Sequence, residues 1–489
     1  MKRYNYILWG VAAMIFLGGM SSCLVGPKLQ DPELGEEEKY RFDSLLVDTI
    51  GNLVWWELFP DTQLYNLVEI ALFENKIVQQ AASRISEANS YVGLKKAEQW
   101  PEFNAQIGAS RSSFAFGQNL GSPQNAFSIA PSMSWEIDFW GKYRHASRAA
   151  RQELLASQYG QRTILLDLVT AVATNYILLM RYDDQLKIAR RTVLSRQESK
   201  RIIGLRYEFG TVAEIDFNQT EIQEGIAAAA VPFFERLIAQ TEHVLSVLLG
   251  HNPGYIERGE FDALGIPPEI PPGMPAEILA RRPDLMESYH LLVAQNEYIG
   301  VAVANRLPNI SLNALVGFAH SEIGMVFTPE GAVWQIGADL FQPIFQFGKN
   351  LRRVEIEEER FQQQLHSYEN TVIEAFREVE DALVNIDTYD RELAARVMQR
   401  DAAINASLLS RSRYDGGQTS YLEVLDSERS MFDAELATSE VRAEYLISYF
   451  ALYKALGGGW LTFEEKEAEG TAKAAAEEAA KQIEESRNN

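Results

Sequence analysis

The chain has 489 residues, of which 46% are hydrophobic and 23% are charged, and its formal charge is −23 at neutral pH. This composition excludes a disordered chain, and the length suits two or three ordinary domains or one large elongated one. Nucleic acid is excluded as a partner, because phosphate binding needs clustered Lys and Arg and no such cluster occurs.

The first 22 residues predict a secretory signal peptide. Two basic residues precede an apolar run over 6–20, which is short for a membrane-spanning helix. The run ends in "GMSSC", and Cys23 is the one cysteine of the sequence. This stretch resembles the lipobox of bacterial lipoproteins, in which the cysteine becomes the acylated N-terminus. Leu24 follows in place of the Asp that retains lipoproteins at the inner membrane, so the resemblance implies the outer membrane.

The chain then repeats itself with a constant offset. Five pairs of landmark residues are separated by 207 positions: Gly93 and Gly300, Pro101 and Pro308, Lys142 and Lys349, Gly210 and Gly417, Gly250 and Gly457. A constant offset over five landmarks indicates two copies of one unit. We therefore expect a lipid-anchored segment at 23–66, a first repeat at 67–250, a linker at 251–273, a second repeat at 274–457 and a charged tail at 458–489.

Each repeat contains two segments with the alternation of a β-strand. Apolar and polar residues alternate from Phe127 to Phe139, and the same parity returns from Trp334 to Leu340. A shorter strand precedes each of these, which predicts β-hairpins at 102–139 and 309–346. Strands of about ten residues suit a tilted membrane strand, and aromatic residues gather near the strand ends as in interfacial girdles.

A long helical pattern follows each hairpin. Apolar residues recur every seven positions, at Leu165, Val172, Leu179, Leu186 and Val193 and at the shifted positions Val372, Val379, Ile386 and Leu393. This spacing is typical of coiled coils, and an uninterrupted helix of about 60 residues would be about 90 Å long. The β-to-α joints fall at the pairs Gly141–Lys142 and Gly348–Lys349. Each long helix ends in a turn, and a second helix returns from it.

Four strands do not form a stable sheet alone in lipid, because an open edge leaves backbone groups without partners. We therefore expect several subunits to close one barrel, with the long helices continuing from it as a tube. The alternative is a lipid-anchored coiled-coil scaffold, whose hairpins would pack as a soluble sheet.

Residues 53–460 resemble the outer-membrane efflux proteins of the TolC and OprM type, in the lipoprotein (NodT-like) branch. The most specific stretch is "ILARRPDLMESYHLLVAQNEYIGVAVANRLPNISL", which has the Arg-Arg-Pro-Asp, the Ile-Gly and the Pro that precede the third strand in the family. Ser288 and Tyr289 depart from the usual Ala-Glu. The resemblance implies an α+β membrane protein, a homotrimer whose 12-stranded β-barrel continues as an α-helical coiled-coil periplasmic tunnel. It also implies an equatorial collar around the tunnel, formed by 23–66 and by the linker 251–273.

The resemblance also implies function and partners. It implies a channel in the outer-membrane lipid that passes drugs or other solutes outward from an inner-membrane pump, of the RND type, through a periplasmic adaptor. A type I secretion duct is the alternative. In the family the constriction lies at the helix turns, where acidic side chains help to close it. The matching candidates in this sequence are Glu208, Gly210, Glu214, Asp415, Gly416, Gly417 and Thr419. We expect the three glycines to adopt backbone angles that other residues avoid.

Enzymatic chemistry has no support in the sequence, and we expect no cofactor. The six histidines lack metal-ligand spacing, and neither a Gly-rich phosphate loop nor a nucleophile elbow occurs. Arg281, Arg282 and Asp284 could form an anion site. Pro283 beside them instead favours the start of a helix, with structural ion pairs.

Overall fold

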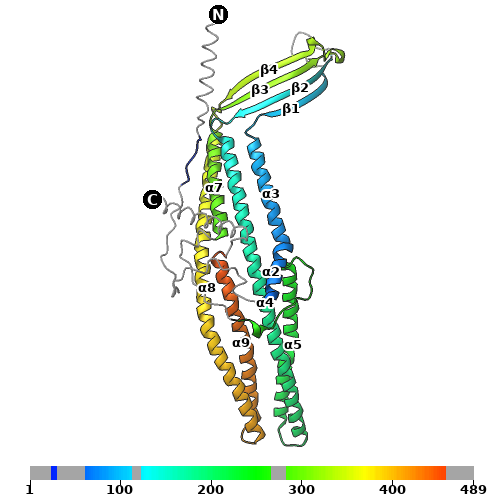
Figure 1. Cartoon of the computed structure of the whole chain (residues 1–489), viewed down its shortest axis with the longest axis vertical. Helices are drawn as coiled ribbons and strands as arrows, with labels where there is room; N and C mark the ends of the chain where they lie inside the picture. Colours follow the sequence, from blue (N-terminus) through cyan, green and yellow to red (C-terminus); the bar gives the residue numbers. More distant parts are fainter. Residues whose placement is uncertain (1–23, 30–60, 113–122, 266–281, 459–489) are drawn as a thin grey trace, which may run out of the picture. The chain divides into compact units, whose positions relative to one another are not determined.

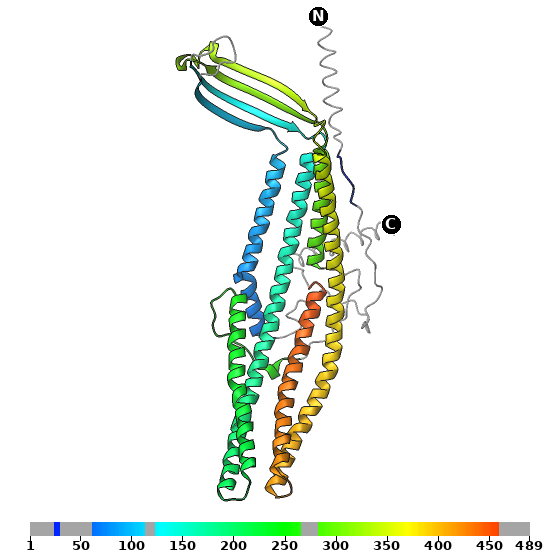
Figure 2. The same cartoon turned by 180° about the vertical axis from the view of Figure 1, so that it is seen from behind.

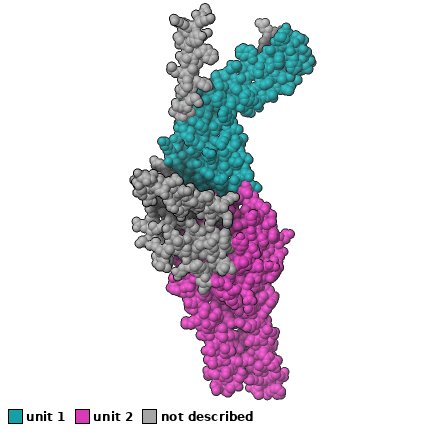
Figure 3. All heavy atoms as spheres, viewed as in Figure 1, with its two compact units in different colours: residues 1–34, 83–159, 286–370 teal, residues 35–82, 160–285, 371–489 magenta. Residues whose placement is uncertain are grey.

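The computed structural model describes residues 24–29, 61–112, 123–265 and 282–458. Cys23, the signal segment and the predicted tail therefore lie outside the described residues. The chain forms two compact units, coloured separately in Figure 3. Unit 1 comprises 1–34, 83–159 and 286–370, and unit 2 comprises 35–82, 160–285 and 371–489.

Unit 1 contains one four-stranded antiparallel sheet in the order β1-β2-β3-β4 (Figures 1 and 2). The hairpins are β1 (Glu102–Ser112) with β2 (Gln124–Ile137), and β3 (Asn309–His320) with β4 (Ala332–Phe341). The central pairing joins β2 of the first repeat to β3 of the second. Strands β1 and β4 are the two open edges.

The helices reproduce the 207-residue offset. Helices α4 and α8 have 67 residues each, and α5 and α9 have 35 each. A 13-residue helix, α2, lies before the first repeat's helices. The bounds are α2 Thr62–Glu74, α3 Lys76–Ala97, α4 Lys142–Glu208, α5 Glu214–Leu248, α7 Pro283–Ala304, α8 Lys349–Asp415 and α9 Tyr421–Ala455. The expected two-fold repeat is confirmed.

The strand register gives the sheet one apolar face and one polar face. Phe103 lies opposite Met133, and Met133 lies opposite Ala314, so these residues share a face. Following the register across all four strands places Ile107, Ile129, Trp135, Leu312, Trp334, Ile336 and Leu340 on that face. The other face carries Asn104, Gln106, Ser132, Ser134, Asn313, Gln335 and Asp339. This alternation is what a barrel with lipid outside and a wet lumen requires.

The core of unit 2 surrounds the heptad stripe of α4. Val172, Tyr176 and Leu179 are fully buried and belong to a cluster with α2, α5 and α9. Among the described residues, α4 is also the one helix long and apolar enough to cross a membrane by composition, yet half of its apolar window is buried within the protein. The apolarity of α4 is therefore that of a core helix.

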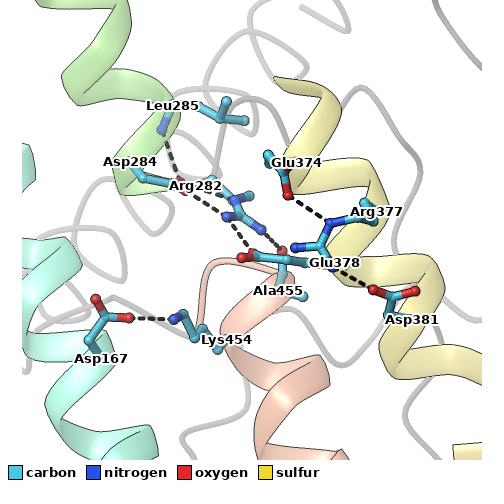
Figure 4. Close-up of polar contacts among 10 residues, drawn as sticks. All are labelled: Asp167, Arg282, Asp284, Leu285, Glu374, Arg377, Glu378, Asp381, Lys454 and Ala455. Atoms are coloured by element: carbon cyan, nitrogen blue, oxygen red, sulfur yellow. Dashed lines mark hydrogen bonds and ion pairs between the residues drawn. The ribbon is translucent and has the colours of Figure 1, made fainter. Parts of the chain in front are cut away.

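Arg282 joins the first residues of α7 to the parts of α8 and α9 that belong to unit 2 (Figure 4). It lies directly before α7, where its Nη2 is 2.6 Å from Asp284 and 2.8 Å from Glu378 of α8, and its Nη1 donates to the carbonyl of Ala455 at the end of α9. Burial alone would lower the pKa of Arg282, but the hydrogen bonds to both carboxylates outweigh it and the pKa is raised. The Arg-Arg-Pro-Asp stretch thus starts a helix and caps another, as predicted; Arg281 lies outside the described residues.

Asn75 occupies the equivalent place in the first repeat. Its Nδ2 donates to the carbonyl of Leu248, 2.8 Å away, and Leu248 ends α5 as Ala455 ends α9. Its Oδ1 accepts from the backbone N–H groups of Ile77 and Val78, which caps α3. The two repeats therefore share a hydrogen bond as well as their helix bounds.

We expect Arg282→Met to destabilise the protein by about 1 to 3 kcal/mol, because it leaves the partly exposed carboxylate of Glu378 and the carbonyl of Ala455 without their donor. Thermal unfolding of the detergent-solubilised protein, followed by circular dichroism, measures this. The matched control is Arg377→Met, since Arg377 pairs with Glu374 and Asp381 on the exposed face of the same helix. Equal unfolding midpoints for the two variants would contradict the assignment.

Candidate functional site

The first β-to-α joint is held by ion pairs. Lys142 begins α4 and its Nζ lies 3.0 Å from Oε1 of Glu136 in β2. Arg144 Nε lies 3.1 Å from Asp138, whose carboxylate also accepts from the backbone N–H groups of Tyr143 and Arg144. Asp138 thereby satisfies open donors at the start of the helix. Gly141 has φ +81°, a conformation that L side chains rarely adopt.

The second joint shares the left-handed glycine and the helix start of the first but differs in its side chains and in the backbone before the glycine. Gly348 has φ +80°, and Lys349 begins α8. Pro343 and Phe345 replace Glu136 and Asp138, so the described residues give Lys349 no ion pair. Phe347 is the one described non-glycine residue with positive φ. A cavity of about 190 Å³ lies between the joints, lined by residues of both, including Lys142, Lys349 and Arg353.

The two helix turns, both in unit 2, have closely similar geometry. Gly210 and Gly417 each have φ +69°. The next residue in each turn, Thr211 or Gln418, donates its backbone N–H over 2.8 Å to the carbonyl five positions earlier, the pattern of a helix that ends on a left-handed glycine. The expectation that all three turn glycines adopt a left-handed backbone is wrong for Gly416, whose φ lies outside the left-handed region. It occupies the place of Phe209 in the first turn, where any residue fits.

The acidic candidates at the turns differ in their surroundings. Glu208 and Glu214 are exposed and form no ion pair with a described residue. Asp415 lies 3.8 Å from Arg206 of α4, so it alone of the three connects the two helical hairpins. Thr419 donates to Glu423, which also lies 3.1 Å from Arg413. Glu423 was not among the residues singled out from the sequence.

A row of ion pairs joins the α4–α5 hairpin to the α8–α9 hairpin within unit 2. We call it the inter-hairpin ladder, and its five rungs are Asp167–Lys454, Arg181–Glu444, Arg191–Glu435, Arg196–Glu428 and Arg206–Asp415. Arg196 and Glu428 are buried, and Arg411 also reaches Glu428. The other rungs are partly or largely exposed. Arg196–Glu428 is therefore the rung whose loss costs most.

One feature of the sequence indicates that Glu428 is buried, although Glu428 is not among the residues predicted from the sequence. It lies between Val424 and Phe432 at spacings of four, so it is a carboxylate on the apolar face of a helix. Tyr421, two turns before Glu428, is buried as well, and burial raises its pKa to about 12. The ladder stands beside a small cluster of Ile203, Tyr421, Val424 and Leu425. The buried ion pair and the apolar cluster therefore hold the two helical hairpins together at the same place.

The geometry defines a class of protein. A sheet with an apolar face, a polar face and two open edges, continued by helices of 67 residues, is a subunit of an outer-membrane channel whose barrel is shared among chains. Within the part of the chain that the structure describes, no group of three or more His, Cys, Asp or Glu side chains could hold a metal ion.

Known proteins agree with this class. The family "Outer membrane efflux protein" matches residues 67–251 and 274–458. The cation efflux system protein CusC of Escherichia coli O6:H1 is 30% identical over 450 residues, covering 90% of this chain and 96% of CusC. The pyoverdine export outer membrane protein OpmQ of Pseudomonas aeruginosa is 29% identical over 461 residues, covering 92% and 96%. A crystal structure of CusC has a TM-score of 0.79 at 28% identity, covering 89% of this chain and 100% of that one.

The chain belongs to the outer membrane efflux protein family. It is the outer-membrane channel of a tripartite efflux system, not an enzyme, and it extends into the periplasm. Its partners are a periplasmic adaptor and an inner-membrane pump, and the family implies a trimer.

We expect Glu428→Gln to loosen the two hairpins, because Arg196 then keeps its charge in a buried site with no carboxylate. Spin labels at Leu194 and Leu408, both exposed, in labelled chains diluted with unlabelled ones should report a longer and broader distance. The control is Glu221→Gln, since Glu221 pairs with Lys200 inside one hairpin. If both variants keep the wild-type distance, the buried rung does not hold the hairpins together.

Proposed function

We propose that the two helix turns form the end of the channel that the adaptor contacts, and that the gate of the channel lies there. The proposed residues are Glu208, Gly210, Glu214, Asp415, Gly416, Gly417 and Thr419. The observation that carries the proposal is the Arg206–Asp415 contact, which joins the hairpins directly at their turns. Opening separates the hairpins, so contacts between them keep the channel closed.

The inter-hairpin ladder determines how firmly the gate closes. Exposed ion pairs contribute only about 0 to 1 kcal/mol each, so Asp415 alone is a weak latch. The buried Arg196–Glu428 rung and its apolar neighbours hold the hairpins further from the turns. Adaptor binding then needs to disturb mainly the exposed contacts near the turns.

We propose that Gly141, Lys142, Gly348 and Lys349 act as the joints between barrel and tunnel. Their support is the pair of positive φ angles at the two glycines and the helix starts at the two lysines.

We also propose that residues 23–66, 251–273 and 458–489 form the collar and tail around the repeats. Tyr176 and Arg258 support this for the linker: the Tyr176 hydroxyl accepts from Gly259 N–H, and Arg258 lies 2.5 Å from Asp183.

We propose that Cys23 carries acyl chains in the outer-membrane lipid. The residues that follow Cys23 support this, since the N–H of Val25 donates to the carbonyl of Trp140 at the first joint. The anchor would then be tethered next to the end of the barrel strands. A Cys23→Ser chain would still insert, because a barrel buries far more apolar surface than an acyl chain.

We propose a pump of the RND type as the inner-membrane partner, and the support for it is the resemblance to the TolC and OprM type. Relatives of similar identity are named for unlike cargoes, cations for CusC and pyoverdine for OpmQ. Cargo choice would therefore rest with the pump, and the channel would pass whatever the pump delivers. Efflux is favoured over type I secretion because these relatives are named for efflux and export of small solutes.

For the gate, we expect Asp415→Ala to raise basal conductance slightly in planar bilayers, and the triple variant with Glu208→Ala and Glu214→Ala to raise it clearly. The reason is that several exposed contacts, summed over three chains, hold the closed state. The control is Glu374→Ala, an exposed acid of α8 whose one ion-pair partner among the described residues is Arg377 on the same helix. Unchanged conductance in an intact triple-variant trimer would remove these carboxylates from the gate.

A further inference from the structure

The residues that directly follow Cys23 pack against the first joint. They read Leu24-Val25-Gly26-Pro27, and we call residues 24–27 the strap. The strap belongs to unit 1 and is part of the dark blue segment in Figures 1 and 2. Proline fixes its own φ and disfavours the helical region for the residue before it, so this sequence favours an extended chain over a helix.

The strap lies against residues from both repeats, which we call the strap site. The strap site comprises Trp140, Gly141 and His145 of the first repeat with Asn296 and Gly300 of the second. The N–H of Val25 donates to the carbonyl of Trp140, and Asn296 Nδ2 donates to the carbonyl of Pro27, each over 3.4 Å. Both hydrogen bonds are long, so they alone do not fix the strap.

Close packing at glycines fixes the strap more firmly. A Cβ on Gly26 would lie 2.9 Å from the Cα of Gly300, a backbone atom that cannot turn aside. Gly26 also has φ +148°, a conformation that L side chains rarely adopt. At the start of the strap, a Cβ on Gly141 would lie 2.5 Å from Cδ1 of Leu24. The strap and its site therefore fit each other because these positions have no side chain.

His145 lies beneath the strap, between the two repeats. It is 5% exposed, and its Nδ1 contacts a carboxylate oxygen of Glu297 on α7. Its Nε2 is buried and has no hydrogen-bond partner among the described residues. A Cβ on Gly26 would lie 3.6 Å from Cε1 of the same ring. The strap thus helps to keep water from an imidazole that α4 and α7 hold between them.

Gly300 is the position at which the helix and the strap meet. It lies inside α7, where glycine is less favourable than alanine, so its presence calls for a packing reason. A Cβ at this position would lie 2.6 Å from three atoms of the His145 ring. The missing side chain lets the ring lie flat against α7 on one side and lets Gly26 approach the helix backbone on the other.

We infer that the strap holds the first repeat against the second at the first joint, a role separate from the lipid anchor to which it leads. The inference rests on the proposed acylation of Cys23 only for what precedes the strap. All the strap contacts given above are with protein, on Trp140 and Gly141 of one repeat and on Asn296 and Gly300 of the other. Release of the strap exposes the His145 ring to water and loosens the contact between α4 and α7.

The first test is the mobility of a nitroxide on Lys28→Cys, an exposed position directly after the strap, in the full-length channel. A bound strap restricts the labelled backbone, so the spectrum should show mainly slow motion. Adding Gly26→Val should raise the mobile fraction about fivefold, because its side chain meets the backbone of Gly300. Gly300→Ala should raise it as well by displacing His145. The matched control is Gly225→Ala, a glycine inside α5 with nothing within 4 Å of its Cβ position.

Hydrogen exchange measures whether the strap supports the contact between the repeats. In Gly26→Val the backbone amides of 142–146 and 296–301 should exchange about fivefold faster than in the wild-type channel, whereas those of 225–235 keep their rates. Wild-type label mobility in both Gly26→Val and Gly300→Ala, or an equal rise in Gly225→Ala, overturns the strap site. A mobile label with wild-type exchange at both segments makes the strap a tether alone and overturns its role between the repeats.

The same experiment tests the anchor separately. Cys23 is the one cysteine of the wild-type chain, so the wild-type channel should take up no nitroxide if acyl chains occupy that thiol. Label on the wild-type channel would contradict the acylation of Cys23. Hydrogen exchange needs no thiol, so the inference about the strap stands or falls on it in that case.

Discussion

The structure depends on one constraint: a backbone N–H or C=O in the hydrocarbon of a membrane must find a partner within protein. One chain supplies four strands and therefore two edges with unpaired backbone groups, β1 and β4. One face of the sheet is apolar and lies against lipid, so water does not reach these backbone groups to form hydrogen bonds with them. Another copy of the chain is what remains, and three chains of four strands give the 12 strands that the family implies.

The internal repeat lets one chain supply four strands of the shared barrel from two copies of one unit. Two similar units, offset by 207 residues, give each chain two hairpins, two joints and two long helical pairs. At each joint a left-handed glycine, Gly141 or Gly348, turns the chain from strand to helix. The repeats have diverged where their neighbours differ. Glu136 and Asp138 pair within the chain, whereas the equivalent Pro343 lines the cavity between the joints and the equivalent Phe345 is exposed.

Much of the fold follows from sequence pattern, because period-two and heptad patterns report burial directly. The strand segments, the joints and the helix turns lie where the alternation, the Gly-Lys pairs and the glycines predict them. The inter-hairpin ladder does not follow in this way. Arg196 and Glu428 are 232 positions apart, and their meeting depends on the rotation of two helices about their axes, which a heptad stripe defines too coarsely. Gly416 is a different case, because the 207-residue offset pairs Gly417 with Gly210 and Gly416 with Phe209, and so already indicates Gly417 as the left-handed residue.

The measurement that most directly tests the shared barrel is native mass spectrometry of the detergent-solubilised protein, combined with circular dichroism of the same sample. The account predicts a particle of three chains, and loss of strand signal whenever the particle dissociates, because the open edges β1 and β4 are not stable apart. A monomer that retains its full strand signal in detergent would contradict it, since four strands would then satisfy their backbone without a second copy.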